Sequence, residues 1–188
     1  MSQLTLYSQF NMRKPFLVSS DIEDVAGHLI ADGVRLEQWQ LRLPGQGRSM
    51  SKDLILNLYQ QEIVQIKSEL GFQCADFMSV GRKNSNLISL RSRFLSEHTH
   101  SEDEVRFFIS GTVLVYLHID QRIYIVQCGA GDFLVIKKGI KHWFDMGPEP
   151  VFSCIRWYGS EEGLKNQYTG SYVAESTPRW ESILGAPL

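Results

Sequence analysis

Cysteine is scarce in this sequence. Its 188 residues contain three, Cys74, Cys128 and Cys154, and no two of them form a Cys-x-x-Cys pair. Closed structural zinc sites favour cysteine ligands, so the scarcity argues against a zinc ion held purely for structure. Cysteines without obvious partners also indicate a reducing compartment rather than a disulfide framework.

Long apolar runs and clusters of positive charge are missing as well. No segment reaches the ~18 consecutive apolar residues needed to span a bilayer, and the amino end lacks a basic region followed by an apolar run. The formal net charge is −2 at pH 7, and no Lys/Arg cluster offers a surface for nucleic acid. We therefore expect a cytoplasmic protein with neither a membrane nor a nucleic-acid partner.

The composition that remains is that of a globular domain, with 43% hydrophobic and 21% charged residues. Helical spacing, capping signals and glycine stops predict helices over residues 20–32, 52–70, 87–94 and 161–167. Alternating or short apolar runs predict strands over residues 4–10, 34–39, 77–80, 113–118, 122–126, 133–136, 142–144 and 151–158. The short, evenly spaced strands after residue 104 favour a sandwich or a barrel.

Two histidines and a glutamate stand close together at His-x-His-x3-Glu spacing, as His98, His100 and Glu104. Successive side chains of a strand alternate between faces, so His98 and His100 point the same way, and Glu104 shares their face if a short kink over residues 101–103 preserves the alternation. Two imidazole nitrogens and a carboxylate oxygen form most of a ligand shell for a divalent transition metal. We expect His142 to supply the fourth ligand from a distant strand, with His118 as the reserve. Any one of these histidines alone is more often an ordinary polar or core residue than a ligand.

The same residues resemble the metal-binding motifs of the cupin superfamily, G-x5-H-x-H-x3,4-E-x6-G and G-x5-P-x-G-x2-H-x3-N. The positions that match are His98, His100, Glu104, Gly111, Gly131, Gly139 and His142. The positions that depart from the motifs are Ser92, Lys137 and Met146. None of the three departures is a ligand, so they affect turn geometry more than metal binding.

A closer resemblance is to the acireductone dioxygenases. It is carried by residues 94–108 (Phe-Leu-Ser-Glu-His-Thr-His-Ser-Glu-Asp-Glu-Val-Arg-Phe-Phe) and 142–147 (His-Trp-Phe-Asp-Met-Gly), and it extends from about residue 33 to residue 170. The resemblance implies a mainly β protein, a jelly-roll-like cupin double-stranded β-helix barrel with α-helices from an amino-terminal extension. We expect one cupin domain over residues 1–188: flanking strands and helices over 1–93, the barrel core with the metal site over 94–158, and a carboxy-terminal extension over 159–188.

The resemblance also implies an activity and a cofactor. The expected substrate is an acireductone with a methylthio side chain, 1,2-dihydroxy-3-keto-5-methylthiopentene, which is an intermediate of methionine salvage and is cleaved with O2. With Fe(II) the family forms formate and 4-methylthio-2-oxobutanoate, and with Ni(II) it forms formate, carbon monoxide and 3-methylthiopropanoate. We expect one Fe(II) or Ni(II) per chain and a monomeric protein. The alternative is another cupin, either a non-catalytic small-ligand-binding module or a metal-dependent isomerase.

An enediolate that chelates the metal brings two negative charges, so positive charge is expected nearby. Arg106, two residues from Glu104, is the first candidate, with a salt bridge at the barrel mouth as its alternative role. Arg156 is the second, because an arginine in an apolar strand is costly unless it is paired. Asp103 could take a proton from the substrate, although a solvated loop carboxylate is an equal interpretation.

An apolar wall for the thioether tail is the remaining expectation. The resemblance implies that Phe94 and Phe144 line the pocket, while core packing is expected for at least one of the aromatic residues near the ligands. Some relatives place a tryptophan where Leu164 stands, so the outer wall of this pocket is expected to differ.

Overall fold

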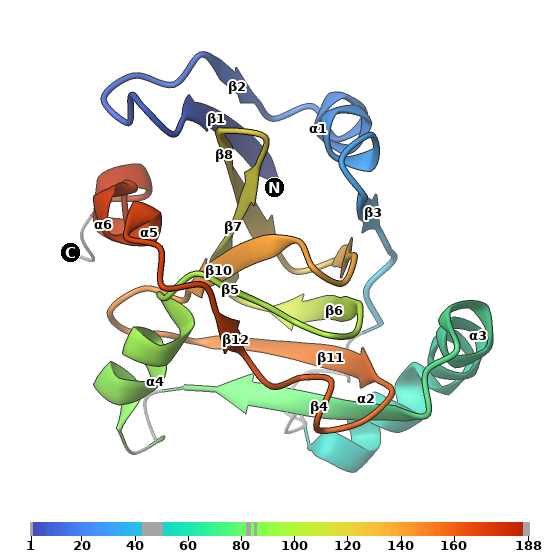
Figure 1. Ribbon diagram of the computed structural model, residues 1–188. Helices are drawn as coiled ribbons and strands as arrows, with labels where there is room; N and C mark the ends of the chain where they lie inside the picture. Colours follow the sequence, from blue (N-terminus) through green and yellow to red (C-terminus); the bar gives the residue numbers. More distant parts are fainter. Residues whose placement is uncertain (1, 43–50, 82–83, 85, 186–188) are drawn as a thin grey trace.

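The computed structural model describes residues 2–42, 51–81, 84 and 86–185. Two antiparallel sheets form most of the molecule (Figure 1). The larger sheet runs in the order β12 (Gln167–Tyr168), β5 (His98–Thr99), β10 (Lys141–Asp145), β7 (Thr112–Ile119), β8 (Arg122–Gly129), β1 (Gln3–Ser8) and β2 (Leu17–Ser19). The smaller sheet runs in the order β3 (Val34–Gln38), β9 (Asp132–Ile136), β6 (Glu104–Ser110), β11 (Phe152–Tyr158) and β4 (Cys74–Val80).

The apolar residues of the two sheets alternate between an inner and an outer core. On β6, Phe108 faces the inner core, which both sheets share, while Phe107 and Ile109 face the outer side. Alternation along a strand places every second side chain on the same face, so one sequence run lines both cores. The interior between the sheets is therefore the core of a barrel, one of the two arrangements that the strand pattern favoured.

Helices cover the outer faces of both sheets. The helices α2 (Lys52–Leu58) and α3 (Gln60–Leu70) lie beside β4 and β11, and their residues share a core with the outer face of the smaller sheet (Figure 1). The short helices α5 (Val173–Ser176) and α6 (Trp180–Ile183) pack in the same way on the larger sheet. In the described part of the chain no helix has the length and apolarity needed to cross a bilayer.

The expected helix over residues 20–32 is confirmed as α1 (Ile22–Ile30). Its N-cap is Asp21, whose carboxylate accepts hydrogen bonds from the backbone N–H groups of Glu23 and Asp24 at 2.9 and 3.2 Å. These bonds satisfy two of the free donors at the start of a helix. The helix ends three residues before Gly33, which takes the positive φ of +79° in the turn that follows.

The expectation of one continuous helix over residues 52–70 is wrong at Tyr59, where α2 ends and α3 begins. The Tyr59 ring is buried, and its hydroxyl accepts a hydrogen bond from Arg42 N at 2.6 Å and donates one to Arg42 O at 3.1 Å. A tertiary hydrogen bond of this kind has no signature in helical periodicity.

A second expectation that is wrong is the helix over residues 161–167. These residues form turns, and the last of them already belongs to β12. Phe10 was expected to continue the first strand, but β1 ends at Ser8 and Phe10 is exposed. The short helix before the histidine motif is present as α4 (Leu87–Phe94).

Candidate metal centre

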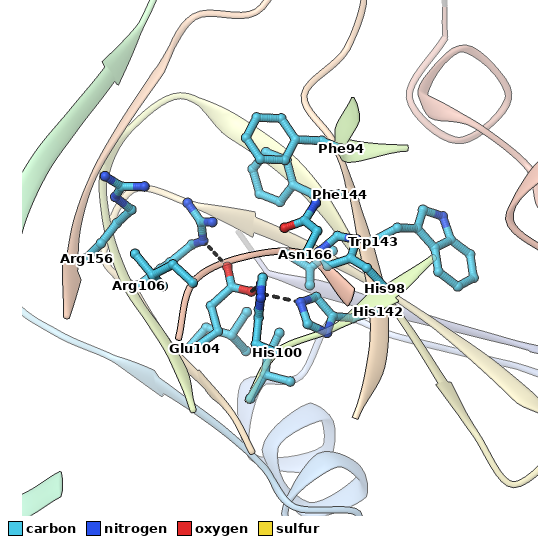
Figure 2. A pocket seen from close by; sticks show the side chains of 14 residues that line it. Phe94, His98, His100, Glu104, Arg106, His142, Trp143, Phe144, Arg156 and Asn166 are labelled. Atoms are coloured by element: carbon cyan, nitrogen blue, oxygen red, sulfur yellow. Dashed lines mark hydrogen bonds and ion pairs between the residues drawn. The ribbon is translucent and has the colours of Figure 1, made fainter. Parts of the chain in front are cut away.

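Three buried histidines converge inside the barrel. His98 lies on β5, His100 follows it, and His142 lies on β10, where its Cα is paired with that of His98. One ring nitrogen from each histidine lies within 4.8 Å of the other two (Figure 2). The hydrogen-bonded pairing of β5 with β10 thus brings His142 to the histidine pair from 42 residues further along the chain.

A backbone carbonyl orients each of the three rings. The Nδ1 atoms of His98 and His142 lie 2.7 and 2.8 Å from the carbonyl oxygens of Ser96 and Ile140, and His100 Nδ1 lies 3.2 Å from that of Lys165. A carbonyl only accepts, so each Nδ1 carries the hydrogen and each Nε2 carries the lone pair in the neutral ring. Metal-binding histidines are oriented in this way, with one ring nitrogen donating a hydrogen bond to the protein and the other available to coordinate the ion.

Glu104 adds a carboxylate to the three nitrogens. Its Oε2 lies 2.8 Å from His142 Nε2 and 3.3 Å from His100 Nε2, and its Oε1 accepts a hydrogen bond from Arg106 Nε. Burial alone would raise the pKa of Glu104, but the charge of Arg106 and the two imidazoles outweigh it and hold the pKa well below its usual range. The carboxylate is therefore available as an anionic ligand.

The pKa values of two of the histidines are displaced in opposite directions. Burial, and then the neighbouring His142, lower the pKa of His98 to about 4, so this ring is neutral at physiological pH. Burial also disfavours charge on His100, but the hydrogen bond and charge of Glu104 outweigh it and raise its pKa. Three imidazole nitrogens and one carboxylate oxygen suit a divalent transition metal such as iron or nickel.

The pocket above these groups contains most of the side chains that the sequence predicted for it. Phe94, Arg106, Phe144, Arg156 and Leu164 all line it. The Phe94 and Phe144 rings meet edge to face at 5.7 Å between centroids, and the Arg106 guanidinium lies over the Phe144 ring. Two phenylalanines from different elements therefore form a continuous apolar wall (Figure 2).

The two predicted arginines are held differently. Arg156 makes a two-point ion pair with Asp76, at 2.9 Å from Nε and 2.6 Å from Nη2. Among the described residues, the Nη1 atom of Arg106 faces only the sulfur atoms of Met78 and Cys154, each at 3.8 Å. Sulfur is a weak acceptor, so Arg106 retains N–H groups that an anionic ligand in the pocket would satisfy.

Two predicted candidates lie elsewhere. The Asp103 carboxylate accepts hydrogen bonds from Lys137 Nζ at 2.8 Å and Lys138 N at 2.9 Å, and Asp103 is not among the residues that line the pocket. His118, the reserve ligand, lies between Glu97 and Gln9, at 2.7 Å from an oxygen of each. It is outside the group of three histidines.

One pocket residue, Asn166, was not predicted, and one aromatic residue next to the ligands packs elsewhere. Asn166 lines it beside Leu164, from the irregular segment that precedes β12. Trp143, next to His142 in the sequence, points away from the histidines (Figure 2) and stacks on Tyr116 at 5.1 Å between ring centroids. Trp143 belongs mainly to the outer core of the larger sheet, which is the packing role expected for at least one aromatic residue near the ligands.

Comparison with known proteins agrees with this geometry. The family model described as the ARD/ARD′ family matches residues 9–166. The chain belongs to the acireductone dioxygenase family. It is 39% identical to the acireductone dioxygenase of Hahella chejuensis, over 98% of each chain, and 41% identical to that of an Enterobacter species, over 95% of this chain and 99% of the relative.

The structural comparison supports the same family. The acireductone dioxygenase from Bacillus anthracis, whose structure has a cadmium ion in the active centre, superposes with a TM-score of 0.79 at 25% identity, covering 89% of this chain and 98% of that one. The barrel is thus the cupin fold, as the motif resemblance implied. The family's activity makes this chain a dioxygenase that acts on a small molecule with O2.

Proposed function

We propose that this chain is a metal-dependent acireductone dioxygenase of methionine salvage, acting as a monomer in the cytoplasm. The proposed substrate is 1,2-dihydroxy-3-keto-5-methylthiopentene, which O2 cleaves to formate and 4-methylthio-2-oxobutanoate, or to formate, carbon monoxide and 3-methylthiopropanoate. The observation that carries the proposal is the convergence of His98, His100, His142 and Glu104 beneath the partly buried Arg106, whose Nη1 meets only sulfur atoms among the described residues.

The four converging side chains would hold one Fe(II) or Ni(II). Three neutral imidazoles and one carboxylate leave a divalent ion with a single positive charge. When bound, the ion would offer positive charge and exchangeable positions to the oxygens of a chelating enediolate. The donor set does not select between iron and nickel, because both accept nitrogen and oxygen ligands in six-coordinate surroundings.

The chain's own residues would bind and shield the substrate. Arg106 would donate charge-assisted hydrogen bonds to an enediolate oxygen, since its Nη1 meets only sulfur atoms in the described residues. Phe94 and Phe144 would take up the thioether tail and keep water from the reacting end, with Leu164 closing the wall. Arg156, which is ion-paired with Asp76, would add positive charge to the pocket lining.

Asp103 was the predicted proton acceptor. Its ion pair with Lys137 and its hydrogen bond from the Lys138 backbone favour the other interpretation, a loop carboxylate that stabilises the turn before β10. Asp103 therefore has no part in the proposed reaction.

The test is to remove all metal, reload separate samples with Fe(II) and Ni(II), and add acireductone under measured O2. We expect oxygen uptake with both metals, carbon monoxide only with nickel, and the methylthio-oxo acid only with iron. Identical products from both forms would mean that the pocket and not the metal directs cleavage. No oxygen uptake with either metal would refute the activity and favour a ligand-binding or isomerase cupin.

A further inference from the structure

After β11 the chain crosses the pocket as residues 159–169, here called the covering segment (Figure 1, between β11 and α5). It places Leu164 and Asn166 in the pocket lining. It also supplies the Lys165 carbonyl that lies 3.2 Å from His100 Nδ1. The other two histidines use the carbonyl of a residue two positions before them, so only His100 is oriented by a segment remote in sequence.

Glu102 holds the first end of the covering segment. Its Oε2 accepts hydrogen bonds from Gly159 N at 2.8 Å and Ser160 N at 3.2 Å, and its Oε1 accepts one from Ser160 Oγ at 2.9 Å. The carboxylate fits closely here, because a Cβ at Gly163 would lie 2.1 Å from Glu102 Cδ. Three hydrogen bonds to one carboxylate make this end a specific attachment rather than a casual surface contact.

Glu97 holds the second end. This carboxylate is buried, and its Oε1 accepts a hydrogen bond from Thr169 Oγ1 at 2.6 Å. The Glu97 backbone oxygen accepts a second one from Thr169 N at 3.1 Å. His118 lies against the other carboxylate oxygen at 2.7 Å, so Glu97 links the covering segment to β7.

The two acids are Glu97 and Glu102, which flank the His98–His100 pair in the sequence. We propose that Glu97 and Glu102 are positioning residues that hold the covering segment over the pocket, so that the Lys165 carbonyl keeps His100 oriented toward the metal. This orientation of His100 slows release of the metal ion. The inference rests on the proposed metal site. It gives Glu97 and Glu102, which are not metal ligands, a role in metal binding.

A consequence of this arrangement is reciprocal coupling between the metal and the covering segment. A metal on Nε2 favours the ring with its hydrogen on Nδ1, and that hydrogen needs the Lys165 carbonyl as acceptor. Closure of the segment therefore strengthens metal binding, and metal binding must strengthen closure by the same factor.

The experiment loads wild type and variants with Ni(II) and follows release of the ion to an excess of chelator, without acireductone. Thr169→Val removes the hydroxyl at one end, and Glu102→Ala removes the carboxylate at the other. We expect each to release nickel at least roughly threefold to tenfold faster, because Thr169→Val loses one hydrogen bond and Glu102→Ala loses three. Thr169→Ser should restore nearly wild-type release, and Gln167→Ala, an exposed position on the same segment, should match wild type.

A second readout separates attachment of the covering segment from a general loss of stability. Lys165 is the one lysine or arginine in the covering segment, so trypsin can cut the segment only after it. We expect faster cleavage there in Thr169→Val and Glu102→Ala, and slower cleavage in the wild type when nickel is bound. Wild type that holds no nickel would refute the metal site itself. Nickel held equally well by wild type and both variants would leave the site intact and overturn the role proposed for Glu97 and Glu102.

Discussion

Replacing Arg106 by alanine separates substrate binding from metal binding. The Arg106 side chain is partly buried, donates through Nε to the ligand Glu104, and directs Nη1 to two sulfur atoms. Arg106→Ala would therefore remove the donors proposed for the enediolate. It would also remove a positive charge that favours the ionised form of Glu104.

The size of the first effect follows from the chemistry of the lost contact. A hydrogen bond to a charged group contributes about 1.5–3 kcal/mol, which corresponds to a loss of roughly 10- to 150-fold in kcat/KM. Lysine at this position should recover only part of the loss, because it lacks the planar fork of arginine. The nickel or iron content at neutral pH should stay close to one per chain, since the four ligands remain.

The assay is steady-state oxygen uptake with acireductone, alongside metal analysis of the same samples. Arg156→Ala is the matched control, because the Arg156 fork is already occupied by Asp76 and its removal should cost less. Wild-type kinetics in Arg106→Ala would give the residue a structural role. A loss of activity that follows a loss of metal would show that Arg106 acts only through Glu104.

The remaining predictions concern other groups around the site. Alanine at His98, His100, Glu104 or His142 should abolish tight metal binding and lower the thermal midpoint of the loaded protein, whereas His118→Ala should keep its metal. Asp103→Asn should retain at least half of the wild-type kcat, because its carboxylate lies on Lys137 and Lys138; a hundredfold loss would restore it as the proton acceptor. Asp145→Ala should destabilise the protein by about 3 kcal/mol in urea unfolding. The buried Asp145 pairs with Arg91 and accepts hydrogen bonds from the backbone N–H groups of Gly147 and Trp180. A loss of unfolding free energy below about 1 kcal/mol would contradict this prediction.

Local patterns in the sequence were sufficient for the parts of the site that depend on strand alternation. Glu104 and Arg106 are two residues apart on β6, so parity alone predicted that they share the pocket. His98 lies on β5 of the other sheet, and the irregular residues 100–103 between the two strands bring it to the same pocket. Alternation could not place His142, because only the pairing of β5 with β10 brings it to His98. It was expected as the fourth ligand from the need for a further donor, and the spacing of the second motif supported that choice. The interior and exterior faces of β6 and β11 followed from the same alternation.

Features that depend on one distant contact were not predictable from the sequence. Asn166 lines the pocket because the covering segment is held at both ends by Glu97 and Glu102, and no periodicity encodes those attachments. The same segment was misread as a helix, because Glu161 to Gln167 has helical composition. In the structure the Lys165 carbonyl lies against His100 and Gln167 pairs with β5, so the chain does not continue as a helix. Both interpretations of Asp103 stayed open for a related reason: proximity to the ligands in sequence does not set the direction of a side chain in a turn.

The charges across the smaller sheet explain why two arginines can face one cavity. Arg106 on β6 lies directly opposite Arg156 on β11, and Arg156 in turn lies opposite Asp76 on β4. Like charges opposite each other destabilise a sheet, so each arginine needs its own acid, Glu104 for the first and Asp76 for the second. Two arginines and two carboxylates cancel, and a divalent ion would then leave two positive charges in the pocket. A doubly deprotonated acireductone would balance them, so this row of charges favours a dianionic chelating substrate over a neutral one.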